Sequence, residues 1–88
     1  MPKLIKPDGE TQILPDTITF SDIQKLVGGY VETIPCLTRD TMCINEGGKL
    51  QDLPVNPQAT AIAYLFENDF IAGNAIILTP EETQKILN

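Results

Sequence analysis

The chain has 88 residues, enough for one domain with a thin core. It has no histidine, which excludes His-based triads and histidine-containing zinc sites, and its two cysteines are too few for a disulfide scaffold. A formal charge of −6 disfavours nucleic acid and anionic membranes as partners, and no apolar run is long enough for a membrane span or a secretory signal. We therefore expect a protein of a cytosolic, reducing compartment, where Cys36 and Cys43 stay free thiols.

Two β-hairpins are predicted. The first joins residues 3–6 to residues 11–14 through a turn at 7–10, where Pro, Asp and Gly supply the turn chemistry. The second joins the β-rich run 30–35 to a returning strand at 41–45. Both hairpins favour antiparallel pairing.

The two cysteines flank the loop of the second hairpin, at residues 37–40. If that loop is symmetric, Cys36 and Cys43 face each other near its mouth, and a disulfide is geometrically conceivable. A reducing compartment favours free thiols instead.

Three helices are predicted from their capping signals. The first can be capped by Thr19, with Asp22 at the third helical position; Ser21, with Gln24 in the box position, is a second possible cap. Gly28-Gly29 ends this helix. Asn56 caps the second, which we expect over 57–66; it is apolar nearly all round and should be largely buried, partly in a subunit interface. A capping box with a following proline starts the third, at 80–87.

A last strand is expected over residues 70–78, with Gly73-Asn74 inside it as a bulge or a point of close approach. The predicted order of elements is therefore β-β-α-β-β-α-β-α. Strands joined by hairpins indicate a single α+β domain over residues 1–88, with a mostly antiparallel sheet.

The residues present do not favour enzyme chemistry. Neither cysteine has a histidine to activate it, and no pair of carboxylates stands out by its spacing; Glu46, beside Gly47-Gly48, is the best single acid–base candidate. Asp and Glu never occur in the spacing of a calcium loop. We expect a protein that is not an enzyme and that holds no metal and no cofactor.

Several residues have both a structural and a ligand-binding interpretation. The pairs Gly28-Gly29 and Gly47-Gly48 fit either turns or backbone that approaches an anion closely, although neither has the context of a phosphate-binding P-loop. Arg39, the only arginine, is either a solvated charge or the partner of a phosphate or carboxylate. Tyr30 is either a half-buried strand residue or a ring that stacks on a base. The start of the 57–66 helix is either simply capped or an anion site, with polar contacts from Asn56 and Thr60.

Four motifs follow one another along the chain. They are Leu26-Val27-Gly28-Gly29-Tyr30-Val31-Glu32, Asn45-Glu46-Gly47-Gly48-Lys49-Leu50, Leu53-Pro54-Val55-Asn56-Pro57-Gln58-Ala59-Thr60 and Asp69-Phe70-Ile71-Ala72-Gly73-Asn74-Ala75. In this order they resemble a widespread family of small domains of unknown function that is common in phages, prophages and mobile elements of bacteria. The resemblance covers residues 3–79, and Gly47 departs from it, because the family often has an acid at that position.

The resemblance implies a setting and no settled activity. Small accessory proteins of phages often act against bacterial defence, some of them as sponges that sequester cyclic nucleotides or cyclic ADP-ribose isomers of CBASS- or Thoeris-type immunity. We therefore expect a homo-oligomeric, non-enzymatic sponge for a cyclic nucleotide or related small anionic ligand. The alternative is an inhibitor or adaptor that docks an acidic face or an exposed strand edge on a host protein. In the sponge, Arg39 and Lys49 would meet phosphate, Tyr30 would stack on a base, and Asn45, Asn56 and Thr60 would make polar contacts.

Overall fold

The computed structural model describes residues 1–88 and contains five strands and three helices in the predicted order. None of the three helices is long and apolar enough to cross a membrane. The elements are β1 (Lys3–Ile5), β2 (Thr11–Ile13), α1 (Phe20–Val27), β3 (Val31–Pro35), β4 (Thr41–Asn45), α2 (Pro57–Ile62), β5 (Ala75–Leu78) and α3 (Pro80–Leu87).

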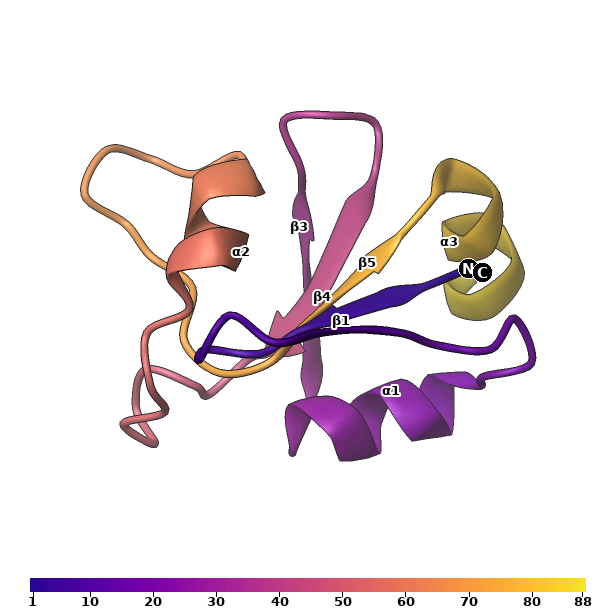
Figure 1. Ribbon diagram of the computed structural model, residues 1–88, viewed down its shortest axis with the longest axis horizontal. Coiled ribbons are helices and arrows are strands. Elements are labelled where there is room, and N and C mark those ends of the chain that lie inside the picture. The colour runs from indigo at the N-terminus through magenta and orange to yellow at the C-terminus, as the bar shows by residue number, and fades with distance from the viewer.

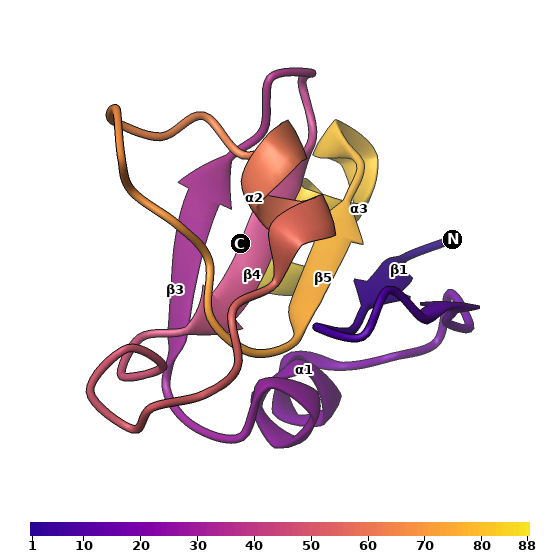
Figure 2. The ribbon, with the colours of Figure 1, turned by 60° about the vertical axis from the view of Figure 1, so that its left-hand side comes forward.

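The five strands form one sheet in the order β2-β1-β5-β4-β3, and every neighbouring pair is antiparallel, as predicted. The last strand in sequence, β5, lies in the middle, between β1 and β4. The two predicted hairpins, β1–β2 and β3–β4, flank it on either side. Strands β2 and β3 are therefore the two edges of the sheet (Figures 1 and 2).

The core has two layers, one on each face of the sheet. Helices α1 and α3 pack on one face, around buried residues such as Ile23, Cys43 and Ile76. The short helix α2 covers part of the other face, where Ala59 packs near Met42. Figure 1 shows α1 and α2 on opposite sides of the strands. Side chains alternate between the two layers along β4 and β5, as the period of a strand requires.

Helices α1 and α3 begin where their capping signals predict. Thr19 accepts a hydrogen bond from the Asp22 amide, and the Asp22 carboxylate accepts one from the Thr19 amide at 2.8 Å. Thr79 and Glu82 form the same reciprocal pair at α3. Such boxes satisfy two of the free backbone donors at a helix start.

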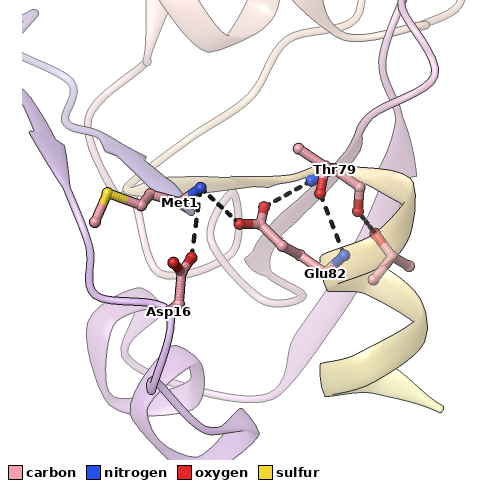
Figure 3. A network of polar contacts seen from close by, with 5 residues as sticks. Met1, Asp16, Thr79 and Glu82 are labelled. Carbon is pink, nitrogen blue, oxygen red and sulfur yellow. Dashed lines mark hydrogen bonds and ion pairs between the residues drawn. The ribbon is translucent and has the colours of Figure 1, made fainter.

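Glu82 has a second partner. Its other carboxylate oxygen lies 2.9 Å from the amine of Met1, which also approaches Asp16 at 3.5 Å (Figure 3). The same side chain therefore caps α3 and joins it to the segment that leads into β1. The Glu82 side chain is largely covered, with 15% of its surface exposed.

The second helix is shorter and less buried than predicted. It ends at Ile62 because the next residues pair with β3: Tyr64 donates to the Pro35 carbonyl at 2.8 Å, and Ala63 forms a bridge with Cys36. Sheet-like pairing therefore replaces the second half of the predicted helix. Tyr64 and Phe66, which we expected to be buried, are 69% and 91% exposed.

The last strand begins at Ala75, later than predicted, because residues 70–74 form a loop instead. Gly73, expected within this strand, has a positive φ of 87°, and a Cβ atom there would lie 2.8 Å from the Leu53 side chain. Gly73 is therefore a point of close approach, which is one of the two alternatives predicted for it.

The cysteines do not face each other. Cys43 pairs with Thr33 in the β3–β4 register, and the Cys36 amide donates to Asp40. The two residues also belong to different core layers. Both are buried free thiols, so the expected free state is confirmed and the conceivable disulfide is not formed.

Candidate functional site

The largest cavity lies where the end of α1 meets the loop after β4, and we call it the α1–β4 cleft. Its volume is about 880 Å³, within the range of about 300–1,000 Å³ typical of small-molecule sites. Gln24 and Lys25 of α1 line one side, and Glu46, Leu50 and Gln51 line the other.

Asn45 forms the floor of the cleft and holds its two sides together. It is 3% exposed, and its amide group donates to the Val27 carbonyl at 3.1 Å and to the Gln51 side chain at 3.4 Å. Its carbonyl oxygen accepts a hydrogen bond from the Gly47 amide at 2.8 Å. Asn45 was predicted to contact a ligand, but its polar atoms are bound to the protein itself.

The two glycine pairs singled out in the sequence meet at this floor. A Cβ atom on Gly29 would lie 3.1 Å from the Asn45 amide nitrogen, and one on Gly47 would lie 3.0 Å from the Gln51 amide nitrogen. The glycines thus let the end of α1 and the loop after β4 come close to Asn45. Both pairs line the cleft through Gly28, Gly29 and Gly47, so backbone forms part of its surface.

Two exposed hydrophobic side chains line the cleft. Tyr30 is 79% exposed, which corrects the half-buried alternative, and Leu50 is 93% exposed. An exposed phenol ring offers an apolar face for stacking and a hydroxyl group for a hydrogen bond. The Tyr30 amide donates to no acceptor in the protein, so this residue also presents a free backbone donor.

The charges of the cleft are one lysine and one carboxylate. Neither Lys25 nor Glu46 takes part in an ion pair. Lys25 can therefore meet an anionic group, and Glu46 can accept hydrogen bonds from a donor such as an amino group or a hydroxyl group. Together with the Tyr30 ring, they suit a small polar ligand with a planar part and limited negative charge.

Two of the predicted ligand-binding residues instead hold the framework of the fold together, Asn56 as a buried residue and Thr60 as a half-buried one. Asn56 is 0% exposed; its amide group donates to the carbonyls of Ile5 and Gly73, each at 2.9 Å, and its oxygen accepts from the Ala59 amide. The Thr60 hydroxyl donates to the Asn56 carbonyl and accepts from the Ile71 amide. Neither side chain has a hydrogen-bond donor left for a ligand.

The two predicted phosphate-binding cations lie outside the cleft. Lys49 pairs with Asp69 and lies over the Phe70 ring, 4.8 Å from its centre. The Lys49 hydrogen bond is the main reason that the pKa of Asp69 lies below its usual range. Arg39 is exposed and unpaired in the β3–β4 loop, at the opposite end of that hairpin from Tyr30. The six predicted residues therefore do not form one site in a single chain.

Lys25, Leu50 and Gln51 line the cleft but were not among the predicted binding residues. Their individual identities give no signal, since exposed lysine, leucine and glutamine side chains are ordinary on helices and turns. The signal that could have found them is the pair of Gly-Gly steps, one on each side of the cleft.

A family model matches residues 3–87, nearly the whole chain, and its description is "Domain of unknown function (DUF3846)". The chain belongs to this family. The resemblance to a family of small domains of unknown function is thereby confirmed. No curated protein and no solved structure matches the DUF3846 chain.

Proposed function

We propose that this DUF3846 domain is a non-enzymatic protein of phages or mobile elements that binds and sequesters a cyclic nucleotide immune signal, with the α1–β4 cleft as its binding site. The observation that carries the proposal is the 79% exposed Tyr30 ring beside a cleft of about 880 Å³ that contains the unpaired Lys25. An aromatic ring can stack on any base, and such stacking contributes about 1–3 kcal/mol per base.

The ligand contacts follow from the cleft. The base lies against Tyr30, and Glu46 accepts hydrogen bonds from an exocyclic amino group or a ribose hydroxyl. Lys25 and the free Tyr30 amide meet one phosphate. Sequestration, and not turnover, is favoured because Glu46 is the only carboxylate that lines the cleft, and because the chain has no histidine to activate the Ser21 hydroxyl there.

Arg39 and Lys49 enter this proposal only through a second copy of the chain. Both lie outside the cleft of their own chain, and Arg39 has no ion-pair partner. A homo-oligomer could place the Arg39 loop of one copy at the cleft of another, which would supply a second cation for a ligand with two phosphates.

The test is calorimetric titration with cyclic dinucleotides, cyclic trinucleotides and cyclic ADP-ribose isomers. One of them should bind, and it should be recovered intact after the protein is denatured. Tyr30→Ala should weaken binding by roughly fivefold to a hundredfold, the equivalent of one lost stacking contact. The matched control is Tyr64→Ala, because Tyr64 is also exposed but lies outside the cleft.

Variants of the cationic residues test which of them contact the ligand. Lys25→Gln should weaken binding, whereas Lys85→Gln, which changes another unpaired lysine on α3, should not. A loss of affinity in Arg39→Ala would support a site shared between copies. The proposal fails if no member of the panel binds, or if the Tyr30 and Tyr64 variants bind the same ligand equally.

A further inference from the structure

Only part of the outer edge of β3 is hydrogen-bonded to the rest of the chain. Strand β3 pairs with β4 on one side. The Glu46 amide donates to the Tyr30 carbonyl at 2.8 Å, and the Cys36 amide donates to the Asp40 carbonyl at 3.0 Å. These two bonds show which residues of β3 direct their backbone groups toward β4. Even-numbered residues of β3 therefore direct their backbone groups toward β4, and the odd-numbered residues direct theirs away from the sheet.

The chain itself covers one end of this outer edge. The Pro35 carbonyl accepts a hydrogen bond from Tyr64, and the Leu37 amide donates to the Ile62 carbonyl, both at 2.8 Å. The outward amide and carbonyl groups of Val31 and Thr33 have no such partner. We call residues 31–33 the open half of β3, and Figure 2 shows the strand at the margin of the sheet.

Exposed aromatic residues stand at both ends of the open half. Tyr30 directly precedes it, and Tyr64 sits where the covered half begins. Beside it lies a pocket of about 360 Å³ that is lined by Glu32, Ile34 and Phe70, among others. A strand added at an edge gains main-chain hydrogen bonds from the edge and specificity from pockets that take its alternate side chains. The open half of β3 has both features.

The negative charge of Glu32, at the centre of the open half, indicates which kind of strand binds there. Glu32 is exposed and forms no ion pair. In a dimer through this edge, Val31 of one copy would pair with Thr33 of the other, and Glu32 would lie directly opposite Glu32 of the second copy. Like charges placed directly opposite are destabilising, whereas opposite charges are stabilising. The edge therefore disfavours a second copy and favours a strand with a basic residue at that position.

We propose that the open half of β3 is a docking edge for an extended segment of a different protein, one that carries Lys or Arg opposite Glu32 and an apolar side chain for the Glu32–Phe70 pocket. The net charge of −6 acts in the same direction, because it attracts a basic partner at long range. This edge is distinct from the α1–β4 cleft, although Tyr30 stands next to both.

The experiment selects binders from displayed random nonapeptides against the intact chain. Enriched peptides should alternate β-branched residues with a Lys or Arg at one fixed position. Thr33→Pro removes an outward amide while leaving the β3–β4 ladder in place, since proline is tolerated on edge strands. It should weaken the selected peptide by about tenfold, the loss expected from one or two backbone hydrogen bonds.

The matched control is Thr11→Pro on the opposite edge, in β2. The bonds from Lys6 to Glu10 and from Leu14 to Pro2 show that the Thr11 amide also points away from its ladder. Thr11→Pro should leave peptide binding unchanged, and circular dichroism checks that both variants fold.

Charge reversal tests the proposed partner chemistry. Selection against Glu32→Lys should enrich peptides with Glu or Asp at the fixed position. The proposal is overturned if no peptide is enriched, if Thr33→Pro binds the selected peptide as well as the parent chain does, or if charge reversal leaves the preference basic. It is also overturned if sedimentation shows the parent chain to be a dimer that Thr33→Pro dissociates, because the occupant is then a second copy.

Discussion

The Asn45 side chain donates a hydrogen bond of 3.1 Å to the carbonyl of Val27, 18 positions earlier in the chain. Val27 is the last residue of α1 and Asn45 is the last of β4, so one amide group joins the two elements whose ends form the cleft. The bond satisfies a carbonyl at a helix end, where partners are scarce. The cleft and the stability of the fold therefore depend on the same residue.

Asn45→Ala should destabilise the domain by about 2 kcal/mol, because it leaves the Val27 carbonyl and the Gly47 amide without their partner. For a domain of this size, that corresponds to a fall in Tm of roughly 8–16 °C. Urea unfolding followed by circular dichroism measures the change. Gln12→Ala is the control, since Gln12 is an exposed amide in β2; equal midpoints for the two variants would contradict the role assigned to Asn45.

Replacement of Asn56 should destabilise the domain more than replacement of Asn45, because the Asn56 amide group donates to two carbonyls in the interior. Asn56→Asp keeps the shape but presents acceptor atoms to the Ile5 and Gly73 carbonyls. The loss of stability at neutral pH should be about 3 kcal/mol or more. It should become smaller as the pH falls, since protonation of a carboxyl held among acceptors restores one donor.

Asn56→Ala serves as the comparison for this pH dependence. It also destabilises the fold, but its difference from the parent chain should not vary with pH, because alanine does not titrate. Parallel pH profiles for the two variants, measured by urea unfolding, would show that Asn56 does not donate to carbonyls in the folded chain.

The capping boxes show what local sequence can predict. Thr19 with Asp22 and Thr79 with Glu82 are three residues apart, so the signal and the contact lie in the same short segment. Asn56 was also placed correctly as a cap, but its two carbonyl partners are 51 and 17 positions away and leave no local trace. A polar side chain at a helix start can thus be recognised, while its burial depends on the rest of the chain.

The same limit applies to α2 and to the cleft. The apolar run after Pro57 predicted a helix to residue 66, yet the pairing of Tyr64 with Pro35 ends it, and that pairing depends on where β3 lies. The cleft is formed by two glycine steps that the fold brings together at Asn45. Its lining residues come from the segments 21–30 and 45–51, so apart from the two Gly-Gly pairs no local pattern in the sequence marks them.

The cysteines should be almost inert in the folded state. Burial raises the pKa of the Cys43 thiol to about 11, and burial also raises the pKa of Cys36. Because the thiolate is the reactive form, iodoacetamide at pH 8 should label Cys43 about a hundredfold more slowly than in denaturing urea, and it should label Cys36 more slowly as well. Mass spectrometry measures the labelling, and rapid modification of the native chain would contradict the burial of either residue.

The contact between Glu82 and the Met1 amine should make stability depend on pH at both ends of the range (Figure 3). The hydrogen bond to Glu82 raises the pKa of the Met1 amine above 8.0. The contribution of this amine to the free energy of unfolding is therefore complete below pH 8, and it is lost as the pH rises through the raised pKa. Burial acts to raise the pKa of Glu82, but the Thr79 amide and the Met1 amine outweigh it and hold the pKa below 4.5. The contribution of Glu82 to the free energy of unfolding is therefore complete above pH 4.5, and it is lost as the pH falls through the lowered pKa.

Glu82→Gln separates the charge from the cap, because glutamine can still accept the hydrogen bond from the Thr79 amide. The variant should be less stable than the parent chain between about pH 4.5 and pH 8, with the difference narrowing on either side. Urea midpoints across this range measure it. Glu81→Gln is the matched control, since Glu81 lies in the same turn and forms no ion pair. If Glu81→Gln gives the same profile, the effect comes from the charge of the helix start as a whole and not from the Met1 contact.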